Sequence, residues 1–410
     1  MPETRTLGID CGTSGLRGVV VDGGGAVLAE AHRPFPAGTT DPAIWARAMD
    51  AVVADLAAAG AIDAIAVDGT SGTLLLTDAD GSPCGVALLY NDTSAAHLAA
   101  RIGQLAPAES AAHGASSPAA RLRLLQERHA AAAFALHQAD WLAARLTGRF
   151  GSSDDNNALK LGWDPVARIW PDWLDRFGIE RRLLPEVVEP GTPLGPVLAG
   201  PLAGAVVVAG TTDGCASFLA TGAAAPGDGV TALGTTLTIK LLSDRPIFAP
   251  EYGIYSHKLL GHWLAGGASN SGGGALLRFF TTEEIEALTP ALRPDEPVDL
   301  GWHPLPGTGE RFPVAAPGLD FAPLDIPDDR ASFLQALLEG IARIEALAYR
   351  RLHELGAPAL ATVRSVGGGA RNPAWTRIRA RHLAVPLADA VSTDAAYGTA
   401  LLARKGLHHD

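Results

Sequence analysis

The chain has 410 residues, of which 47% are hydrophobic and 19% charged, and its formal net charge is −12 at pH 7. This composition is typical of a globular protein with room for two domains, and it excludes long disordered segments. An acidic chain does not attract nucleic acid or an anionic membrane, so we expect neither as a partner.

The cysteines and the N-terminus indicate a reducing compartment. Cys11, Cys84 and Cys215 are far apart and form no CxxC pair, so the sequence predicts free thiols rather than disulfides or a zinc site. The N-terminus leads directly into a strand without an apolar signal core, and no apolar run reaches membrane length. We therefore expect a cytoplasmic protein.

The first predicted element is a β-hairpin with a glycine-rich turn. Residues 7–11 and 16–21 are apolar runs typical of strands, and the turn between them contains Thr13 and Ser14. Backbone N–H groups beside glycine and these two hydroxyls are donors suited to phosphate oxygens. Asp10 at the strand tip would then act through a divalent cation such as Mg²⁺. An ordinary hairpin turn accounts for the same residues.

The rest of the N-terminal half alternates between strand and helix patterns. Polar groups follow two of the predicted strands, at Asp68-Gly69 and at Asn91-Asp92. The elements expected in chain order are a strand at 26–32, a helix from 41 to 60, strands at 62–67, 73–77 and 86–90, helical segments over 95–150, an irregular connection at 185–201 and a strand at 205–209.

The C-terminal half repeats this pattern. Residues 229–242 predict a second hairpin, whose turn contains Gly234, Thr235 and Thr236. Two such turns that face each other across a cleft could hold a polyphosphate from both sides. The remaining elements are a proline-rich insertion at 281–330, a helix at 331–355, a strand at 363–366 that ends in Gly367–Asn372, and a last helix from Asp394.

Both halves share the order hairpin, helix, buried strand and glycine-rich or acidic strand tip. This duplication predicts an α/β fold of the actin-like ATPase (ribonuclease H-like) class. We expect one domain over 1–220 and a second over 221–410, with the last helix, 394–410, able to pack back on the first domain.

The chain resembles the FGGY carbohydrate kinases of the sugar kinase, Hsp70 and actin superfamily. The resemblance spans nearly the full chain, and the motifs occur in the family's order. They are Gly8–Ser14 and Gly234–Thr236 as phosphate motifs, Thr212-Asp213-Gly214, Leu142–Gly148 with Ser153–Ala158, Gly367–Asn372 as adenosine motif, and Asp394–Ala400 as connecting helix. No Walker-type phosphate loop is present, which disfavours a P-loop kinase.

Three segments are most similar to the short branch that includes D-ribulose kinases of cyanobacteria and plants: 68–73, 89–92 and 156–162. Tyr90–Ser94 replaces the Trp-x-Asp-x-Arg strand tip of glycerol kinases and xylulokinases, so the arginine that contacts substrate there has no counterpart. The resemblance implies an ATP-dependent transferase that phosphorylates the C5 hydroxyl of D-ribulose. Xylulose, L-ribulose or another polyol remain alternatives, as does an ATP-binding sensor with little transfer activity.

The resemblance also implies roles for individual residues. Asp213 would be the catalytic base; an Asp before a helix can also be an N-cap, and both roles can coexist. Asp10 would hold Mg²⁺ and contact the substrate. Predicted phosphate ligands of ATP are Thr13, Ser14, Gly234, Thr235 and Thr236; predicted adenosine ligands are Gly367, Gly368, Gly369, Asn372 and Trp375; predicted sugar ligands are Ser71, Asn91, Asp92, Asp10 and Asp213.

Several of these residues have a structural alternative. Trp375 could serve helix entry, and Ser71, Asn91 and Asp92 could serve turn formation. Asn156, Asn157 and Lys160 could belong to a closing segment or to a solvated loop. We expect a monomer or a weak homodimer.

Overall fold

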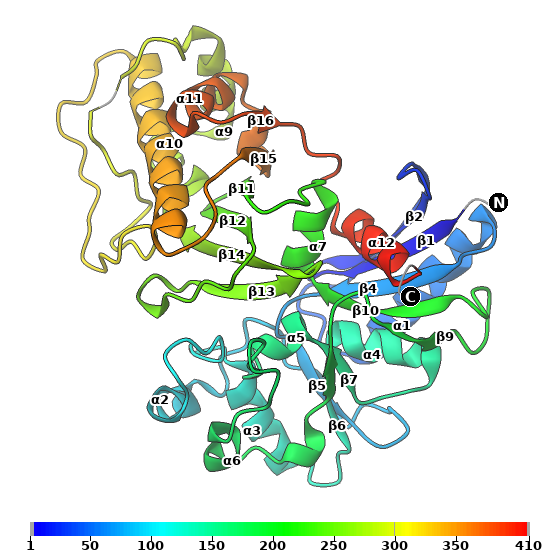
Figure 1. Cartoon of the computed structure of the whole chain (residues 1–410). Helices are drawn as coiled ribbons and strands as arrows, with labels where there is room; N and C mark the ends of the chain where they lie inside the picture. Colours follow the sequence, from blue (N-terminus) through cyan, green and yellow to red (C-terminus); the bar gives the residue numbers. More distant parts are fainter. Residues whose placement is uncertain (1–3, 299, 408–410) are drawn as a thin grey trace. The chain divides into compact units, whose positions relative to one another are not determined.

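The computed structural model describes residues 4–298 and 300–407, which divide into two compact units (Figure 1). The first unit runs from the N-terminus to Ala220 and adds His257–Gly261 and the residues from Asp394 onward. The second unit comprises Thr221–Ser256 and His262–Thr393. Each unit is organised around a six-stranded mixed sheet.

The sheet of the first unit has the strand order β3-β2-β1-β4-β10-β9. Its strands are β1 (Arg5–Cys11), β2 (Gly15–Asp22), β3 (Val27–Pro34), β4 (Ala64–Gly69), β9 (Pro193–Pro196) and β10 (Val206–Thr212). β1, β2 and β3 form an antiparallel meander, whereas β1, β4 and β10 run parallel. The carboxyl ends of the three parallel strands therefore meet at one edge of the sheet.

Helices cover both faces of this sheet. Leu7 and Ile9 of β1 pack in one buried cluster with residues of α1 (Pro42–Leu56) and α4 (Gln138–Thr147). Val19 and Val21 of β2 face the opposite side, where they pack against α12 (Ala395–Gly406) and the end of α7 (Asp213–Ala220). Strand alternation thus divides the apolar residues between two helical layers.

The C-terminal helix α12 lies directly against β1 (Figure 1). Gly8 makes this approach possible, because a Cβ atom there would lie 2.0 Å from the carbonyl oxygen of Ala396 and 2.3 Å from the amide nitrogen of Ala400. The helix begins at Asp394, whose Oδ1 accepts a hydrogen bond from the N–H of Ala396.

A smaller layer of the first unit contains α2 (Ala96–Leu105), α3 (Pro118–Arg128), α5 (Asp155–Leu159), α6 (Trp173–Phe177) and the strand pairs β5 (Leu74–Thr77) with β6 (Phe134–His137) and β7 (Ser152–Asp154) with β8 (Glu186–Val188). Three local predictions were wrong here. Residues 86–90 form an isolated bridge at Leu88 rather than a strand, β6 interrupts the expected helical segment, and 185–201 contains β8 and β9.

The second six-stranded sheet has the strand order β13-β14-β12-β11-β15-β16, and all of it belongs to the second unit except the residues of β13 from His257 onward. The strands are β11 (Asp228–Leu233), β12 (Leu237–Ser243), β13 (Tyr255–Leu259), β14 (His262–Ser269), β15 (Thr362–Val366) and β16 (Leu387–Ala388). An antiparallel hairpin, β11-β12, again lies beside a parallel neighbour, β15. The predicted duplication is therefore confirmed: β12-β11-β15 repeats β2-β1-β4.

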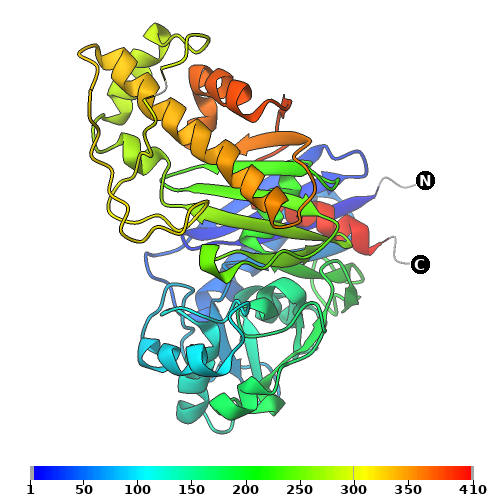
Figure 2. The ribbon, with the colours of Figure 1, turned by 60° about the vertical axis from the view of Figure 1, so that its left-hand side comes forward.

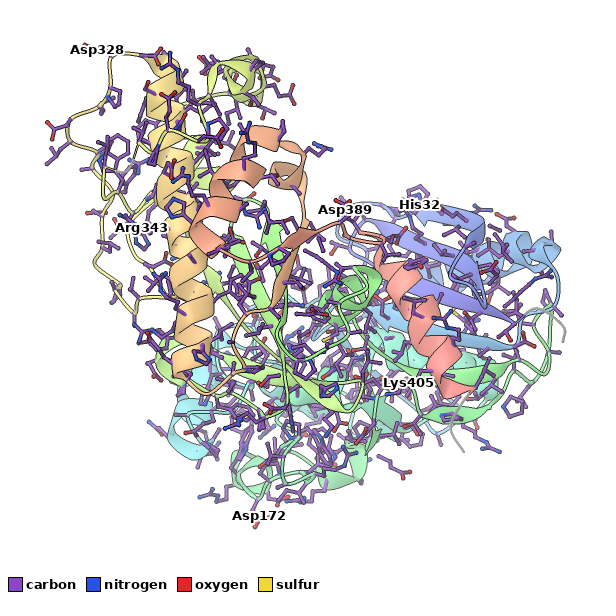
Figure 3. All side chains as sticks on the ribbon, turned by 45° about the horizontal axis from the view of Figure 1, so that its top comes forward. His32, Asp172, Asp328, Arg343, Asp389 and Lys405 are labelled. Carbon is purple, nitrogen blue, oxygen red and sulfur yellow. The ribbon has the colours of Figure 1, made fainter. Side chains whose placement is uncertain are left out.

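The long helix α10 (Arg330–Glu354) crosses this second sheet, with α11 (Pro373–Leu383) beside it (Figure 2). The predicted insertion 281–330 contains α9 (Thr282–Leu288) and is otherwise mostly irregular, and the short α8 (Gly273–Leu276) precedes it. Arg343 of α10, labelled in Figure 3, donates a hydrogen bond from Nη2 to the carbonyl of Trp302 in this segment. In the part of the chain that the structure describes, every helix is too short or too polar to span a bilayer.

Candidate functional site

Three acidic side chains gather at the carboxyl edge of the first sheet. Asp10 of β1 is in register with Asp68 of β4, and Asp68 is in register with Thr211 of β10. Asp213 begins α7 directly after β10. The parallel alignment of three strands thus brings together carboxyl groups that are about 200 residues apart in the sequence.

Burial raises the pKa of both Asp10 and Asp68. Burial raises the pKa of Asp10 to about 6, helped by the negative charges of Asp213 and Asp394 and opposed by a hydrogen bond from Asp68 and by the charge of Arg17. Asp68 is fully buried, and burial together with the charge of Asp10 raises its pKa well above the ordinary value. Asp68 is therefore the protonated member and donates its hydrogen bond to the Asp10 carboxylate.

The donor set of this edge fits a hydrated divalent cation. Asp10 Oδ1 is buried and receives no hydrogen bond from an N–H or hydroxyl group. Among the described residues, no cluster of three or more His, Cys, Asp or Glu side chains could enclose a metal ion. Magnesium commonly uses one or two carboxylates and completes its shell with water and phosphate oxygens, which is compatible with Asp10 as the carboxylate ligand.

Asp213 is the first residue of α7, and its predicted role as the catalytic base stays a prediction. Its Oδ1 accepts a hydrogen bond of 2.6 Å from the N–H of Gly214, so the carboxylate lies at the start of α7. The side chain is half-buried rather than enclosed. A negative charge at this end of a helix is favoured by the N-terminal field of the helix dipole.

The first glycine turn is exposed at the same end of the sheet. The N–H of Gly12 donates to the carbonyl of Gly15 over 3.0 Å, which closes the turn, and Thr13 and Ser14 point to solvent. Gly12 and Thr13 also line a small cavity of about 10 Å³ with Thr70, Tyr90 and other residues. The predicted phosphate turn therefore lies next to the segments that carry the predicted sugar ligands.

The predicted sugar ligands lie in two loops of the first unit. Ser71 follows β4, and its Oγ is buried without a hydrogen-bond partner. Asn91 is exposed, whereas Asp92 Oδ1 accepts hydrogen bonds from the N–H of Ser94 at 2.8 Å and from its hydroxyl at 2.5 Å. Asp92 thus stabilises its own turn, which is the structural alternative considered for it.

Arg121 was missed in the sequence analysis. This buried arginine of α3 donates hydrogen bonds to the carbonyl oxygens of Leu88 and Ser116 at 2.9 Å and to that of Leu89. Burial lowers its pKa to about 10, and the charge of Asp92 opposes this shift. The sequence signal was weak, since an arginine in an Ala- and Leu-rich helix is usually exposed.

Asn156 also has a role that the sequence did not reveal. It is fully buried in α5, so the solvated-loop alternative is wrong. Its Nδ2 donates to Thr211 Oγ1 at 2.9 Å and to the carbonyl of Lys258 at 2.8 Å, and its Oδ1 accepts from the N–H of Lys258 at 2.9 Å. Asn156 therefore fixes the end of β10, two residues before Asp213.

The second unit contains a pocket of about 490 Å³ that collects most of the predicted nucleotide ligands. Its lining is mainly apolar, as expected for a site that binds a base between hydrophobic side chains. The lining includes Gly234, Thr235, Gly273, Leu276, Leu277, Ile285, Leu338, Gly368, Gly369, Asn372 and Trp375.

Glycines allow the walls of this pocket to approach one another. Gly367 has φ = +87°, and a Cβ atom on it would lie 2.9 Å from the carbonyl oxygen of Leu233. A Cβ atom on Gly369 would lie 2.4 Å from the ring of Trp375. The N–H of Gly273 donates to the carbonyl of Gly234 at 2.8 Å, so the start of α8 packs on the second predicted phosphate turn.

Asn372 and Trp375 have structural contacts in this pocket. Asn372 Oδ1 accepts a hydrogen bond from the N–H of Trp375 at 3.0 Å and caps α11, while its Nδ2 donates to Thr289 Oγ1 at 2.9 Å. Trp375 is almost completely buried, and its indole N–H has no hydrogen-bond partner. Contact of either residue with a base remains a prediction.

The comparison with protein families matches both halves of the chain. The N-terminal domain of the FGGY family of carbohydrate kinases matches residues 5–219, and the C-terminal domain of the same family matches residues 229–406. The chain belongs to the FGGY family of carbohydrate kinases.

Among FGGY relatives, a xylulose kinase of Streptomyces coelicolor is 33% identical over 58% of this chain, a match that spans 54% of that protein. A xylulose kinase of Escherichia coli is 26% identical over 91% of this chain and 84% of its own length. A crystal structure of a "xyloylose kinase" from Brucella ovis has a TM-score of 0.86 and 26% identity, covering 99% of this chain and 91% of that one. The first of these matches covers about half of the relative's length.

Proposed function

We propose that this FGGY protein is an ATP-dependent ketopentose kinase that transfers the γ-phosphoryl group to the C5 hydroxyl, with D-ribulose as the first candidate substrate. The observation that carries the proposal is the half-buried Asp213 at the end of β10, beside the buried Asp10–Asp68 pair. An ionised carboxylate next to a carboxylate suited to a cation provides the two charges that phosphoryl transfer to an alcohol requires.

Asp213 acts as the general base in this proposal. It accepts the proton of the C5 hydroxyl as the oxygen attacks phosphorus, and the bond to the β-phosphate oxygen breaks. Its hydrogen bond from the N–H of Gly214 orients the carboxylate. The neighbouring Asp68 keeps its proton and therefore adds no second charge beside Asp10.

Mg²⁺ and ATP are assigned from the donor sets described above. Asp10 would hold Mg²⁺, which when bound neutralises developing charge on the phosphates. Thr13, Ser14 and Gly234–Thr236 would donate to phosphate oxygens. Gly367–Gly369 and Trp375 would contact the adenosine, with the apolar pocket of the second unit as its site.

D-Xylulose is the second candidate, because the relatives reported above are named xylulose kinases. The two sugars are epimers at C3, so the choice depends on which side chain reaches one hydroxyl group. Sequence features favour D-ribulose, since Tyr90–Ser94 differs from the strand tip of the xylulokinases. Sugar-dependent ADP release with D-ribulose, D-xylulose, L-ribulose and glycerol distinguishes these substrates.

Substitution of Asp213 tests the proposed chemistry. Asp213→Asn keeps an acceptor for the N–H of Gly214 but removes the base, so we expect sugar-stimulated ATP turnover to fall by about 10² or more with unchanged ADP affinity. Asp41→Asn is the control, because Asp41 is also an aspartate at the start of a helix of the first unit, and its Oδ1 accepts a hydrogen bond from a backbone N–H. Equal activity of Asp213→Asn and wild type would refute the assignment. ATP hydrolysis without any sugar phosphate would instead favour a sensor.

A further inference from the structure

A buried ion pair lies behind the pocket of the second unit. Glu345 of α10 and Arg379 of α11 have side chains that are at most 1% exposed. Arg379 Nε donates to Glu345 Oε2 at 2.6 Å, and its Nη2 donates to Oε1 at 2.7 Å. This two-point geometry fixes the orientation of both side chains.

The pair extends to two adjacent strands of the sheet. Thr231 Oγ1 of β11 donates to Glu345 Oε1 at 2.6 Å and lies 2.9 Å from the hydroxyl oxygen of Tyr349. Arg379 Nη1 donates to Ser365 Oγ of β15 at 2.7 Å. Thr231 and Ser365 are register partners on the parallel pair β11–β15. One charged pair therefore ties two helices to two neighbouring strands.

These strands lead directly to the glycine segments of the pocket. Gly234 lies three residues after Thr231, and Gly367 lies two residues after Ser365. The two strand ends touch, since the backbone of Gly367 packs against that of Leu233. Arg379 belongs to α11, the helix that starts at the pocket with Asn372 and Trp375.

A buried ion pair is weak evidence of a contribution to stability. Desolvation of two charges offsets much of their attraction, and replacing a buried ion pair by apolar residues often leaves stability unchanged or higher. A fixed geometry is what such a pair provides when all of its donors and acceptors are used, as the contacts of Glu345 indicate.

We propose that Glu345 and Arg379 are positioning residues for nucleotide binding: they hold the ends of β11 and β15 at the spacing that the nucleotide requires. The inference rests on the proposed function only in that the pocket takes a nucleotide. Without the hydrogen bonds of Glu345 and Arg379, the glycine segments that follow β11 and β15 are less well ordered before the nucleotide binds. Nucleotide affinity therefore falls, while ketose affinity does not.

Two small substitutions test the proposal without removing a buried charge. Thr231→Val and Ser365→Ala each cut the network at one strand, and Thr231→Ser keeps the hydroxyl. Isothermal titration with Mg·ADP is expected to give about tenfold weaker binding for Thr231→Val and Ser365→Ala and wild-type binding for Thr231→Ser. The KM for the ketose is expected to stay within about twofold of wild type.

Glu339→Gln is the matched control. Glu339 is also a buried carboxylate of α10, and within the described residues its hydrogen bonds run to Arg381 and His382 of α11. It should lower the melting temperature and leave the Kd of ADP unchanged. Equal ADP affinity in all variants, or equal losses in Glu339→Gln and Thr231→Val, would overturn the proposal. Because ADP binding is measured directly, a wild type that binds ADP but phosphorylates no sugar refutes the proposed kinase and still tests this inference.

Discussion

Asp68 donates a hydrogen bond to the carboxylate of Asp10, its register partner on the neighbouring parallel strand. Thr399 Oγ1 of α12 donates to Asp68 Oδ2, so the C-terminal helix also holds this side chain. The proton stays on Asp68 because this side chain is the more deeply buried of the two. Asp10 can therefore carry a negative charge in a site with little access to water.

The contact between Asp68 and Asp10 predicts the acid limb of the pH–activity profile, the pH range in which activity is lost on acidification. Asp10 must be ionised to hold a cation, and its pKa is raised to about 6 by burial, so activity should fall as the pH drops through about 6. Asp68→Ala removes the donor, which should move the limb to higher pH, whereas Asp68→Asn offers an amide N–H and should leave it near the wild-type position. The pH profile of kcat/KM for Mg·ATP measures this shift. A limb at the same pH in Asp68→Ala would contradict the assignment.

Substitution of Arg121 should weaken sugar binding without changing nucleotide affinity. The guanidinium of Arg121 donates hydrogen bonds to the carbonyl oxygens of Leu88 and Ser116. The bond to Leu88 positions the loop that leads to Asn91 and Asp92. Arg121→Met keeps much of the side-chain volume but loses these hydrogen bonds, so we expect the ketose KM to rise about tenfold or more with unchanged ADP affinity. Initial rates at saturating Mg·ATP provide the measurement.

Arg123→Met is the control for this prediction. Arg123 lies two residues further along α3 and pairs with Glu127, and both side chains are partly exposed. An exposed pair contributes little, so its loss should change neither stability nor KM appreciably. Similar effects of the two substitutions would show that α3 acts only through its stability.

Hairpins and helix starts, which depend on neighbouring residues, could be predicted from the sequence. Contacts between side chains that are far apart in the sequence could not. The two hairpins followed from apolar runs and their Gly-Thr turns, and Asp41 with Pro42 correctly marked the start of α1. Periodicity failed at 86–90, where one bridge at Leu88 replaces a strand. The contact of Arg121 with Leu88 and the Glu345–Arg379 pair could not be recognised, because each joins residues that are more than 30 positions apart in the sequence.

The absence of a side chain at Gly8 allows α12 to pack closely against β1, so a larger residue there should destabilise the protein. A methyl group there would meet the backbone of Ala396 and Ala400, and helix backbone cannot move aside cheaply. Gly8→Ala should lower the free energy of unfolding by about 3 kcal/mol. Gly103→Ala is the control: its Cβ would lie in open space within α2, so this change should stabilise the helix by about 0.5–1 kcal/mol. Urea unfolding of both variants measures the difference.

Glu310 predicts how the stability of the second unit depends on pH. Burial alone would raise the pKa of this carboxyl, but hydrogen bonds from His303, Ser269 and the backbone N–H groups of Asn270 and Arg311 bring it below the ordinary value of 4.5. The folded state thus binds this proton less tightly than the unfolded state. The stabilisation is complete above pH 4.5 and is lost as the pH falls through the folded value.

Asp10 contributes with the opposite sign. Because its folded pKa is raised from 3.8 to about 6, this carboxyl makes the first unit less stable as the pH rises through that window.

Glu310→Gln tests the prediction for Glu310. The loss of melting temperature between pH 6 and about pH 3.5 should be smaller in this variant than in wild type, since Gln cannot take up the proton. Glu251→Gln, at an exposed carboxyl, should melt like wild type at both pH values. Scanning calorimetry measures both variants, and an undiminished loss in Glu310→Gln would mean that the hydrogen bonds to Glu310 do not favour its ionised form.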